Sequence, residues 1–244
     1  MIGENVAGEA DTILNKENYA KELDQMISTF QKEDKVPKLL LHACCAPCSS
    51  YCLEYLREYF AVTVFFYNPN ITEAAEYHKR VAEEKRLIEA YNRQVEMQDF
   101  AGMHSDKNAR RIEMLEGSYV PGDYTEAVRG LEACPEGGDR CIKCYALRLE
   151  ETARVAKKGN FDFFTTTLTI SPLKNADKLN RIGKEMAQKY DVQFLPSDFK
   201  KKEGYKRSIE LSHQFDLYRQ DFCGCGYSKA ERERQKQKSA EKNS

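Results

Sequence analysis

KLLLHACCAPCSS, at Lys38–Ser50, begins as an apolar run and continues through three closely spaced cysteines. The run Lys38–Ala43 has the length and composition of a strand buried on both faces of a parallel sheet. Ser49–Tyr59 (SSYCLEYLREY) shows helical spacing, and Val62–Tyr67 (VTVFFY) predicts a second strand. A strand, a turn, a helix and another strand form the unit from which right-handed parallel sheets are built. The cysteines therefore lie at the carboxyl end of a strand, where open parallel sheets bind their ligands.

The same alternation continues towards the C-terminus. Thr72–Asn92 predicts a long charged helix, whose expected buried face consists of Tyr77, Val81, Ala82, Leu87 and Ile88. Helices are also expected at Cys141–Lys157 and Ala176–Tyr190, and strands at Phe161–Leu168 and Val192–Leu195. Gln98–Gly138 is rich in Gly, Pro and charged residues and predicts an irregular insertion with short helices. The predicted fold class is α/β, a Rossmann-like parallel sheet with an irregular helical insertion that binds metal.

Composition divides the chain into three parts. Residues 1–37 predict a helical N-terminal extension, with Tyr19, Leu23, Met26, Ile27 and Phe30 at helical spacing. Residues 38–228 form a single α/β catalytic domain, because no repeat or linker divides them. Residues 229–244 (KAERERQKQKSAEKNS) form a charged, low-complexity C-terminal tail.

The composition is that of a cytoplasmic globular protein. Of the 244 residues 41% are hydrophobic, yet no apolar run approaches the roughly 18 residues of a membrane span. The N-terminal residues include acidic side chains and lack the apolar segment of a signal peptide. We therefore expect a cytoplasmic location and no membrane partner. Because the formal net charge is −1, a nucleic acid would have to bind a local basic patch.

Nine cysteines exceed what a cytosolic core uses, and their odd number argues against a fully paired disulfide framework. The first cluster, Cys44, Cys45 and Cys48, lies where a strand turns into a helix. Free amides at that helix N-terminus favour thiolates and an anionic metal cluster. A lone cysteine there could be a small buried hydrophobe, which is what we expect of Cys52, one turn further into the helix. His42 is expected as a hydrogen-bonded core histidine.

Two further cysteine clusters follow. Cys141 and Cys144 form a C-x2-C pair that opens a helix, and two glycines separate it from Cys134. A C-x2-C pair is compatible with zinc, iron–sulfur and dithiol chemistry. Cys223 and Cys225 form a C-x-C pair next to glycines, which lets the backbone approach a metal closely or forms a strained, easily reduced disulfide.

Zinc is the main alternative to an iron–sulfur centre. Structural zinc sites close with four ligands, commonly from two C-x2-C pairs. With Cys52 set aside, eight cysteines remain, and their spacings differ from those of zinc knuckles. An iron–sulfur cluster bound by four thiolates, with the other thiols binding a second metal or forming a redox pair, explains the number of cysteines better.

Five motifs occur in order along the chain. They are HACCAPCSS at 42–50, YNPNI at 67–71 followed by EYHKR at 76–80, EGGDRCIKCYALRLEETA at 136–153, FTTTLTISPLKN at 164–175, and DFKKKEGYKRSIELS at 198–212 followed by LYRQDFCGCGYS at 217–228. Together they resemble the cobalamin-independent epoxyqueuosine reductase family (QueH type). The resemblance runs from about Lys38 to Ser228, nearly the whole expected domain.

The resemblance implies an oxidoreductase that reduces the epoxide of epoxyqueuosine, at the wobble position of a tRNA with a GUN anticodon, to give queuosine. It also implies a [4Fe-4S] cluster, an additional mononuclear iron and an external electron donor. The first strand, turn and helix resemble the PP-loop/HUP nucleotide-binding fold, with cysteines in place of its SGGxDS phosphate loop, so we expect no ATP pyrophosphatase activity. Some family members carry an acidic residue where this chain has Cys48, so its ligand set for the second iron would be richer in sulfur.

On this basis the expected cluster ligands are Cys44, Cys45, Cys141 and Cys144. The candidates for the second iron or for a redox-active disulfide, and hence for catalysis, are Cys48, Cys223 and Cys225. Cys134 could join either group. The candidate proton donors are Asp139, Tyr145 and Glu136.

Basic residues after Asp198 form the expected tRNA-binding surface, because single-stranded loops bind through their phosphates and by stacking on aromatic rings. They are Lys200, Lys201, Lys202, Lys206, Arg207 and Arg219, with Tyr205 and Tyr218 interleaved. Another strand end carries Thr165–Thr167 with Ser171, Pro172 and Lys174, and these residues are expected to line the same crevice as the cysteines. Two other classes remain open: a zinc or thiol-redox protein without tRNA activity, which needs no basic segment, and a PP-loop tRNA sulfur transferase, which needs the missing phosphate loop.

Overall fold

The structure, a computed structural model, describes residues 17–242, so the predictions for residues 1–16 and 243–244 lie outside the described residues. Within them, five parallel strands form one sheet in the order β3-β2-β1-β4-β5. The strands are β1 Lys38–Ala43, β2 Ala61–Phe66, β3 Glu113–Glu116, β4 Phe163–Thr166 and β5 Gln193–Phe194. The chain winds outward from β1 in both directions, as in Rossmann-like folds. The predicted fold class is confirmed.

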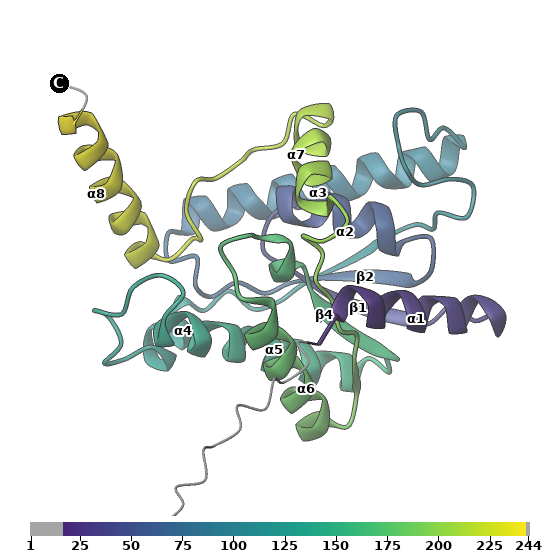
Figure 1. The fold of residues 1–244 in the computed structure, drawn as a ribbon, viewed down its shortest axis with the longest axis horizontal. Coiled ribbons are helices and arrows are strands. Elements are labelled where there is room, and N and C mark those ends of the chain that lie inside the picture. The colour runs from purple at the N-terminus through teal and green to yellow at the C-terminus, as the bar shows by residue number, and fades with distance from the viewer. Residues whose placement is uncertain (1–16, 243–244) are drawn as a thin grey trace, which may run out of the picture.

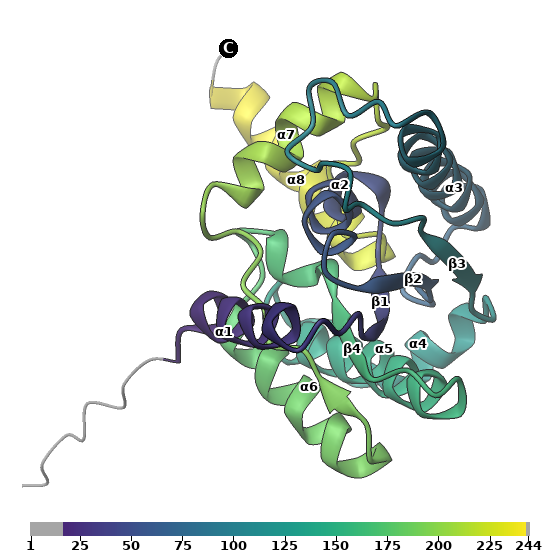
Figure 2. The same ribbon diagram turned by 90° about the vertical axis from the view of Figure 1, so that its right-hand side faces the viewer.

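Helices cover both faces of the sheet (Figures 1 and 2). One face carries α1 Tyr19–Lys32, α2 Ala46–Leu56 and α3 Ala74–Met97, with α7 Gly204–Gln214 packed against α2. The other face carries α5 Asp139–Lys158 and α6 Ala176–Tyr190. The remaining described helices are α4 Pro121–Ala127, the 3-10 turn η1 Thr167–Ile170 and α8 Gly226–Lys242. None of the described helices is long and apolar enough to cross a membrane.

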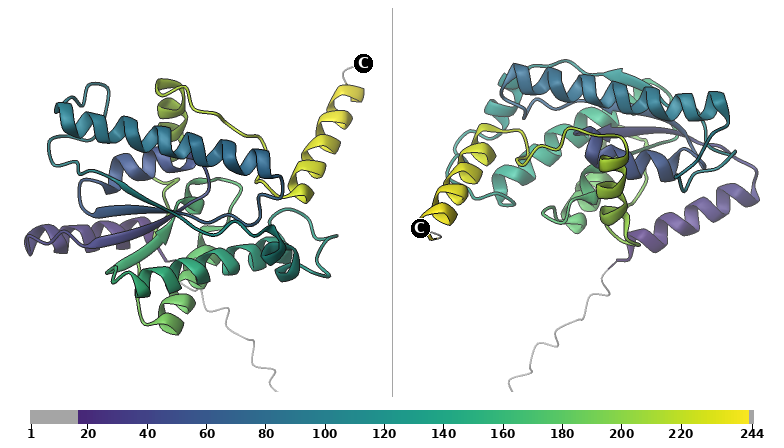
Figure 3. Two further views of the ribbon diagram at one scale, coloured as in Figure 1. Left: turned by 180° about the vertical axis from the view of Figure 1, so that it is seen from behind. Right: turned by 90° about the horizontal axis from the view of Figure 1, so that it is seen from above.

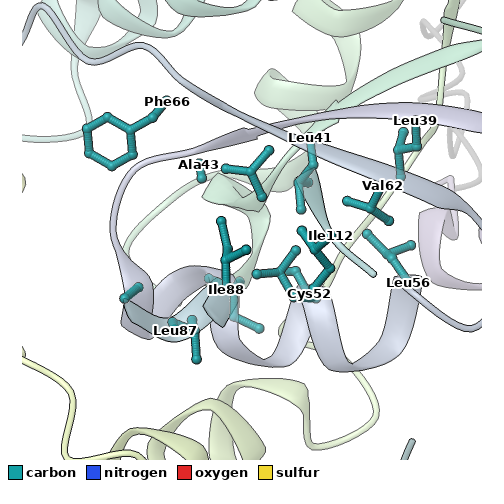
Figure 4. Packing of buried hydrophobic residues seen from close by; sticks show 14 of the residues in the cluster. Leu39, Leu41, Ala43, Cys52, Leu56, Val62, Phe66, Leu87, Ile88 and Ile112 are labelled. Atoms are coloured by element: carbon teal, nitrogen blue, oxygen red, sulfur yellow. The ribbon is translucent and has the colours of Figure 1, made fainter. Parts of the chain in front are cut away.

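The central strand β1 is buried on both sides. Leu39, Leu41 and Ala43 point into the core beneath α2 and α3 (Figure 4), whereas Leu40 points into the core beneath α5 and α6. Two-sided burial explains why this strand is a continuous apolar run rather than an alternating one. Cys52 also lies in the first core and is 0% exposed, as predicted.

The carboxyl ends of three neighbouring strands are tied together by His42. Its Nδ1 lies 2.9 Å from the Thr166 hydroxyl at the end of β4, and its Nε2 lies 3.1 Å from the Tyr67 carbonyl just beyond β2. Burial lowers the pKa of His42 to about 3, so the ring is neutral. The histidine is therefore the hydrogen-bonded core residue that was predicted, and it holds the strand ends at which the cysteines begin.

Several elements differ from the prediction. β3 lies in the stretch 98–138 that was expected to be irregular, and it pairs only with β2 at the sheet edge. The strand expected at Phe161–Leu168 ends at Thr166 and continues as η1. α7 occupies part of the segment described only as basic and aromatic. The expected burial of Ala82 is wrong: this residue is exposed, and Glu84 lies on the buried face of α3 instead.

Candidate metal centre

Three cysteines at the end of β1 bring their sulfurs together. The Sγ atoms of Cys44, Cys45 and Cys48 all lie within 4.8 Å of one another, and we call these residues the first thiol group. Cys44 follows β1 and Cys45 occupies the N-cap position of α2 without capping it through its side chain. Hydrogen bonds from the other two thiols lower the pKa of Cys44 and raise that of Cys48. The group therefore favours one shared thiolate even without a metal, at a helix N-terminus that stabilises negative charge.

Four further cysteines lie on α5 and in the loop before α8, and we call them the second thiol group: Cys141, Cys144, Cys223 and Cys225. Cys141 also packs against the buried cluster that includes Cys44 and Cys45. Cys144 on α5 and Cys225 just before α8 belong to one buried cluster with Tyr124 and Val128. Burial raises the pKa of Cys144 to about 12, and the neighbouring sulfurs of Cys223, Cys225 and Cys141 add to the effect. The predicted convergence of cysteines from separate segments is therefore seen between α5 and the loop before α8.

The loop that carries the C-x-C pair is held rigidly. Gly224 has a φ of +122°, and a Cβ added to it would lie 2.8 Å from the Ile71 side chain, so only glycine fits. The buried Arg80 of α3 donates from Nη1 to the Cys223 carbonyl at 3.2 Å and from Nη2 to the Phe222 carbonyl at 3.4 Å. These contacts hold the backbone that carries both cysteines.

A pocket of about 480 Å³ opens beside both thiol groups. Its wall includes Cys44 and Cys48 from the first group and Cys223 from the second. Ser171, Pro172 and Lys174 line the same pocket, as expected. The expectation is wrong for Thr165–Thr167, which are buried and do not line it. We refer to this space below as the pocket.

Two cations, which form no ion pair among the described residues, lie beside the thiols. Arg148 is 0% exposed, donates from Nε to the Cys144 carbonyl, and has no hydrogen-bond partner for Nη1 or Nη2 among the described residues. Burial alone would lower the pKa of this arginine, but the sulfurs of Cys144, Cys223 and Cys44 raise it above its usual value. Burial likewise lowers the pKa of Lys174, but the neighbouring sulfurs of both groups raise it, and the net pKa is above its usual value.

This environment fits an anionic sulfur-bound metal group. Seven thiols in two groups supply soft ligands, and a buried guanidinium with two unsatisfied nitrogens lacks the anion that would compensate it. An iron–sulfur cluster with its thiolates carries such negative charge.

The other predicted site residues lie at varied distances from the pocket. Glu136 lines it and accepts a hydrogen bond from the Ser228 hydroxyl, whereas Asp139 and Tyr145 do not line it. Tyr145 is buried, and burial raises its pKa. Cys134 faces a different groove, between α8 and its own loop. The catalytic roles of these residues stay predictions.

Most basic residues of the predicted tRNA surface are engaged by acidic neighbours. Lys200 pairs with Asp198, Lys202 with Asp24, Lys206 with Glu203, and Arg207 with Glu54 and Glu210. Lys201 is exposed, and Arg219 lines the pocket. Their binding to tRNA stays a prediction.

Arg148 and Arg80 were missed by sequence reasoning. Arg148 is four residues after Cys144 and seven after Cys141, so all three lie on one side of α5. The position of Arg148 beside the two cysteines could therefore have been predicted from this spacing. The role of Arg80 depends on a contact with a loop more than 140 residues away, which nothing in its own segment reveals.

Replacing Cys52 with alanine should leave metal binding intact. The residue packs against apolar side chains only in the core beneath α2. Losing one buried heavy atom should lower the free energy of unfolding by about 1 kcal/mol. Metal analysis and urea denaturation of the variant check this, and loss of metal from it would contradict the placement of Cys52 in the core.

Comparison with known proteins identifies the family to which this site belongs. The family model described as "Epoxyqueuosine reductase QueH" matches residues 39–231. Proteins named epoxyqueuosine reductase QueH are similar to the chain over most of its length. That of Streptococcus pyogenes serotype M1 is 42% identical over 213 residues, covering 87% of this chain and 78% of the relative. That of Staphylococcus epidermidis is 37% identical over 215 residues, covering 87% and 85%. That of Thermotoga maritima is 34% identical over 193 residues, covering 79% and 91%.

Proposed function

This chain belongs to the epoxyqueuosine reductase QueH family, and we propose that its pocket is where the epoxide of epoxyqueuosine is reduced. The protein is an oxidoreductase of queuosine biosynthesis, and its substrate is a tRNA. In the proposed reaction the modified base at the wobble position of a GUN anticodon loses its epoxide oxygen as water, which requires two electrons and two protons. An external donor supplies the electrons.

The observation that carries this proposal is that sulfurs from both thiol groups face one pocket. We propose that the second thiol group, Cys141, Cys144, Cys223 and Cys225, holds a [4Fe-4S] cluster, which takes four thiolates. The first thiol group would hold an additional iron through up to three sulfurs. Two observations support this division: the sulfurs of Cys44, Cys45 and Cys48 lie close together, and Cys144 and Cys225 share one buried cluster. The division expected from the sequence, with Cys44 and Cys45 beside Cys141 and Cys144, is the competing proposal.

The bound iron centres would supply electrons and a Lewis acid for the epoxide oxygen. The side chains of the protein bind the substrate, orient it and supply the protons. Lys174 and Arg219 give the pocket wall positive charge that suits an oxygen-rich nucleoside and its phosphates. Of the three candidate proton donors, Glu136 is the one that lines the pocket. We therefore propose that a carboxyl proton of Glu136 is delivered within the pocket, with the Ser228 hydroxyl orienting the acid.

The function is tested with anaerobically purified protein, a chemical reductant and tRNA that carries epoxyqueuosine. We expect queuosine in the digested tRNA, detected by mass spectrometry as the loss of one oxygen atom. The active protein should contain at least about four irons and matching sulfide. Stoichiometric zinc in an active preparation would overturn the iron–sulfur proposal, and intact epoxyqueuosine with a fully loaded iron protein would overturn the reaction.

A further inference from the structure

The C-terminal helix α8 stands away from the rest of the protein (Figures 1 and 3). It begins at Gly226, directly after Cys225, so its first turns form part of the pocket wall. Its side chains from Arg232 to Ala240 are all exposed. A helix that is polar on all sides and does not pack against the rest of the domain is stabilised little by burial. Contact with a partner would explain why this segment is helical.

The charge of this helix is opposite to that of the chain. Between Lys229 and Ala240 there are five basic and two acidic residues, although the whole chain has a formal net charge of −1. The segment after residue 231 also lies beyond the region that the family model matches. The first turns of the helix therefore lie inside the matched region, and most of its basic residues lie outside it.

Three of the five basic residues form no ion pair among the side chains that the structure describes. Lys229 pairs with Glu73 and Lys236 with Asp221. Arg232 donates from Nε to the Asp221 carbonyl instead, and Arg234 and Lys238 have neither kind of partner within residues 17–242. Both line a groove of about 760 Å³ between α8 and the loop before α5. Arg140, whose guanidinium stacks on Tyr227 at 4.8 Å from the ring centroid, lines the same groove.

The contrast with Lys200–Lys202, which we call the lysine run, is informative. Lys200 and Lys202 of this run are already neutralised by Asp198 and Asp24. A phosphate that bound either lysine would have to compete with a carboxylate. Arg234 and Lys238 form no ion pair among the described residues, although Glu132 and Glu231 line the same groove. They lie one helical turn apart, about 6 Å along the axis.

We propose that α8 is an arm that binds the sugar–phosphate backbone of the tRNA anticodon loop, with Arg234 and Lys238 contacting phosphates near the nucleotide held in the pocket. This inference rests on the proposed function, which makes a tRNA the substrate. The helix begins at the pocket wall, and Arg234 and Lys238 line the neighbouring groove, so we expect the backbone of a strand with one base in the pocket to continue along that groove. Contacts of this kind position the substrate and carry no sequence specificity.

The test compares two double variants of the full chain, R234Q/K238Q on α8 and K200Q/K202Q in the lysine run. Both remove two positive charges, and glutamine preserves helix propensity. The dissociation constant for an unmodified tRNA transcript with a GUN anticodon is measured at several salt concentrations. We expect R234Q/K238Q to bind roughly 10- to 30-fold more weakly at 0.1 M salt, with a salt slope shallower by about 1.4, since each single-strand phosphate contact contributes about 0.7. We expect K200Q/K202Q to stay within about twofold of the unmodified protein.

The controls separate this inference from the function itself. Iron content and circular dichroism should be unchanged in both variants, because the substituted side chains do not contact the thiols. If R234Q/K238Q binds tRNA as tightly as the unmodified protein, or loses affinity equally at every salt concentration, the arm is not an electrostatic docking surface. If only K200Q/K202Q weakens binding, the lysine run is the surface instead. Failure of the unmodified protein to convert epoxyqueuosine would count against the proposed function, whatever the binding data show.

Discussion

Cys225→Ala is expected to yield protein without an iron–sulfur cluster, and with turnover reduced by at least about 100-fold. Cys225 belongs to the second thiol group, is 6% exposed and lies beside Cys144. Its Sγ accepts a hydrogen bond from the Ser228 amide at 3.4 Å. If this group holds the cluster, removing one of its four thiolates should open the centre to oxygen and loss of iron. The measurement is an anaerobic absorption spectrum together with iron and sulfide content.

Cys45→Ala discriminates between the two ligand sets. The division that we propose predicts that this variant keeps the cluster and loses only the additional iron, because Cys45 belongs to the first thiol group. The set expected from the sequence predicts the reverse: Cys45→Ala would lose the cluster and Cys225→Ala would keep it. Cys52→Ala is the matched control, since it removes a buried thiol of α2 that faces the core. Equal iron loss in Cys45→Ala and Cys225→Ala would contradict both divisions.

The sequence was most informative where local and tertiary requirements coincide. β1 and α6 have the predicted bounds, Lys38–Ala43 and Ala176–Tyr190. β1 is apolar because both of its faces are buried, and α6 starts at an Asn175 cap that accepts from the Lys178 amide. Both signals are contained within the segment itself.

What could not be predicted depends on contacts between distant segments. The sequence EMLE of β3 has no strand preference, and the strand forms because β2 offers an open edge. Spacing within each cysteine motif showed that thiols gather, but the proximity of Cys144 to Cys225 depends on how the loop before α8 returns to α5. The ion pair of Lys202 was equally hidden, because its partner Asp24 lies on α1 near the other end of the chain. That of Lys200 is local, since Asp198 is only two residues away.

Arg148 shows how a buried charge can connect folding to metal binding. In a metal-free protein, its two terminal nitrogens are removed from water without a hydrogen-bond partner among the described residues. Leaving a buried charge uncompensated costs several kcal/mol, and replacing buried ionic groups with apolar side chains is often neutral or stabilising by about 1–4 kcal/mol. A negatively charged metal–thiolate centre between Cys144, Cys223 and Cys44 would compensate the charge.

Arg148→Met should therefore have opposite effects on the two forms of the protein. Without metal, the free energy of unfolding in urea should not fall, and an increase of up to about 4 kcal/mol is expected. With metal, the loss of the counter-charge should weaken iron retention against a chelator by about 10- to 100-fold, the range for groups that support metal ligands. Arg148→Lys keeps the charge and should retain most of the metal affinity.

Arg57→Met is the matched control, because Arg57 is also 0% exposed but is fully engaged. Its guanidinium donates to the Ser105 hydroxyl, the Tyr91 carbonyl and the Gln94 side chain. Removing it leaves those acceptors unpaired, so the metal-free protein should lose about 3 kcal/mol of stability, and iron retention should not change. If Arg148→Met destabilises the metal-free protein as much as Arg57→Met does and leaves iron retention unchanged, Arg148 is a structural residue of α5 and not the counter-charge of the thiols.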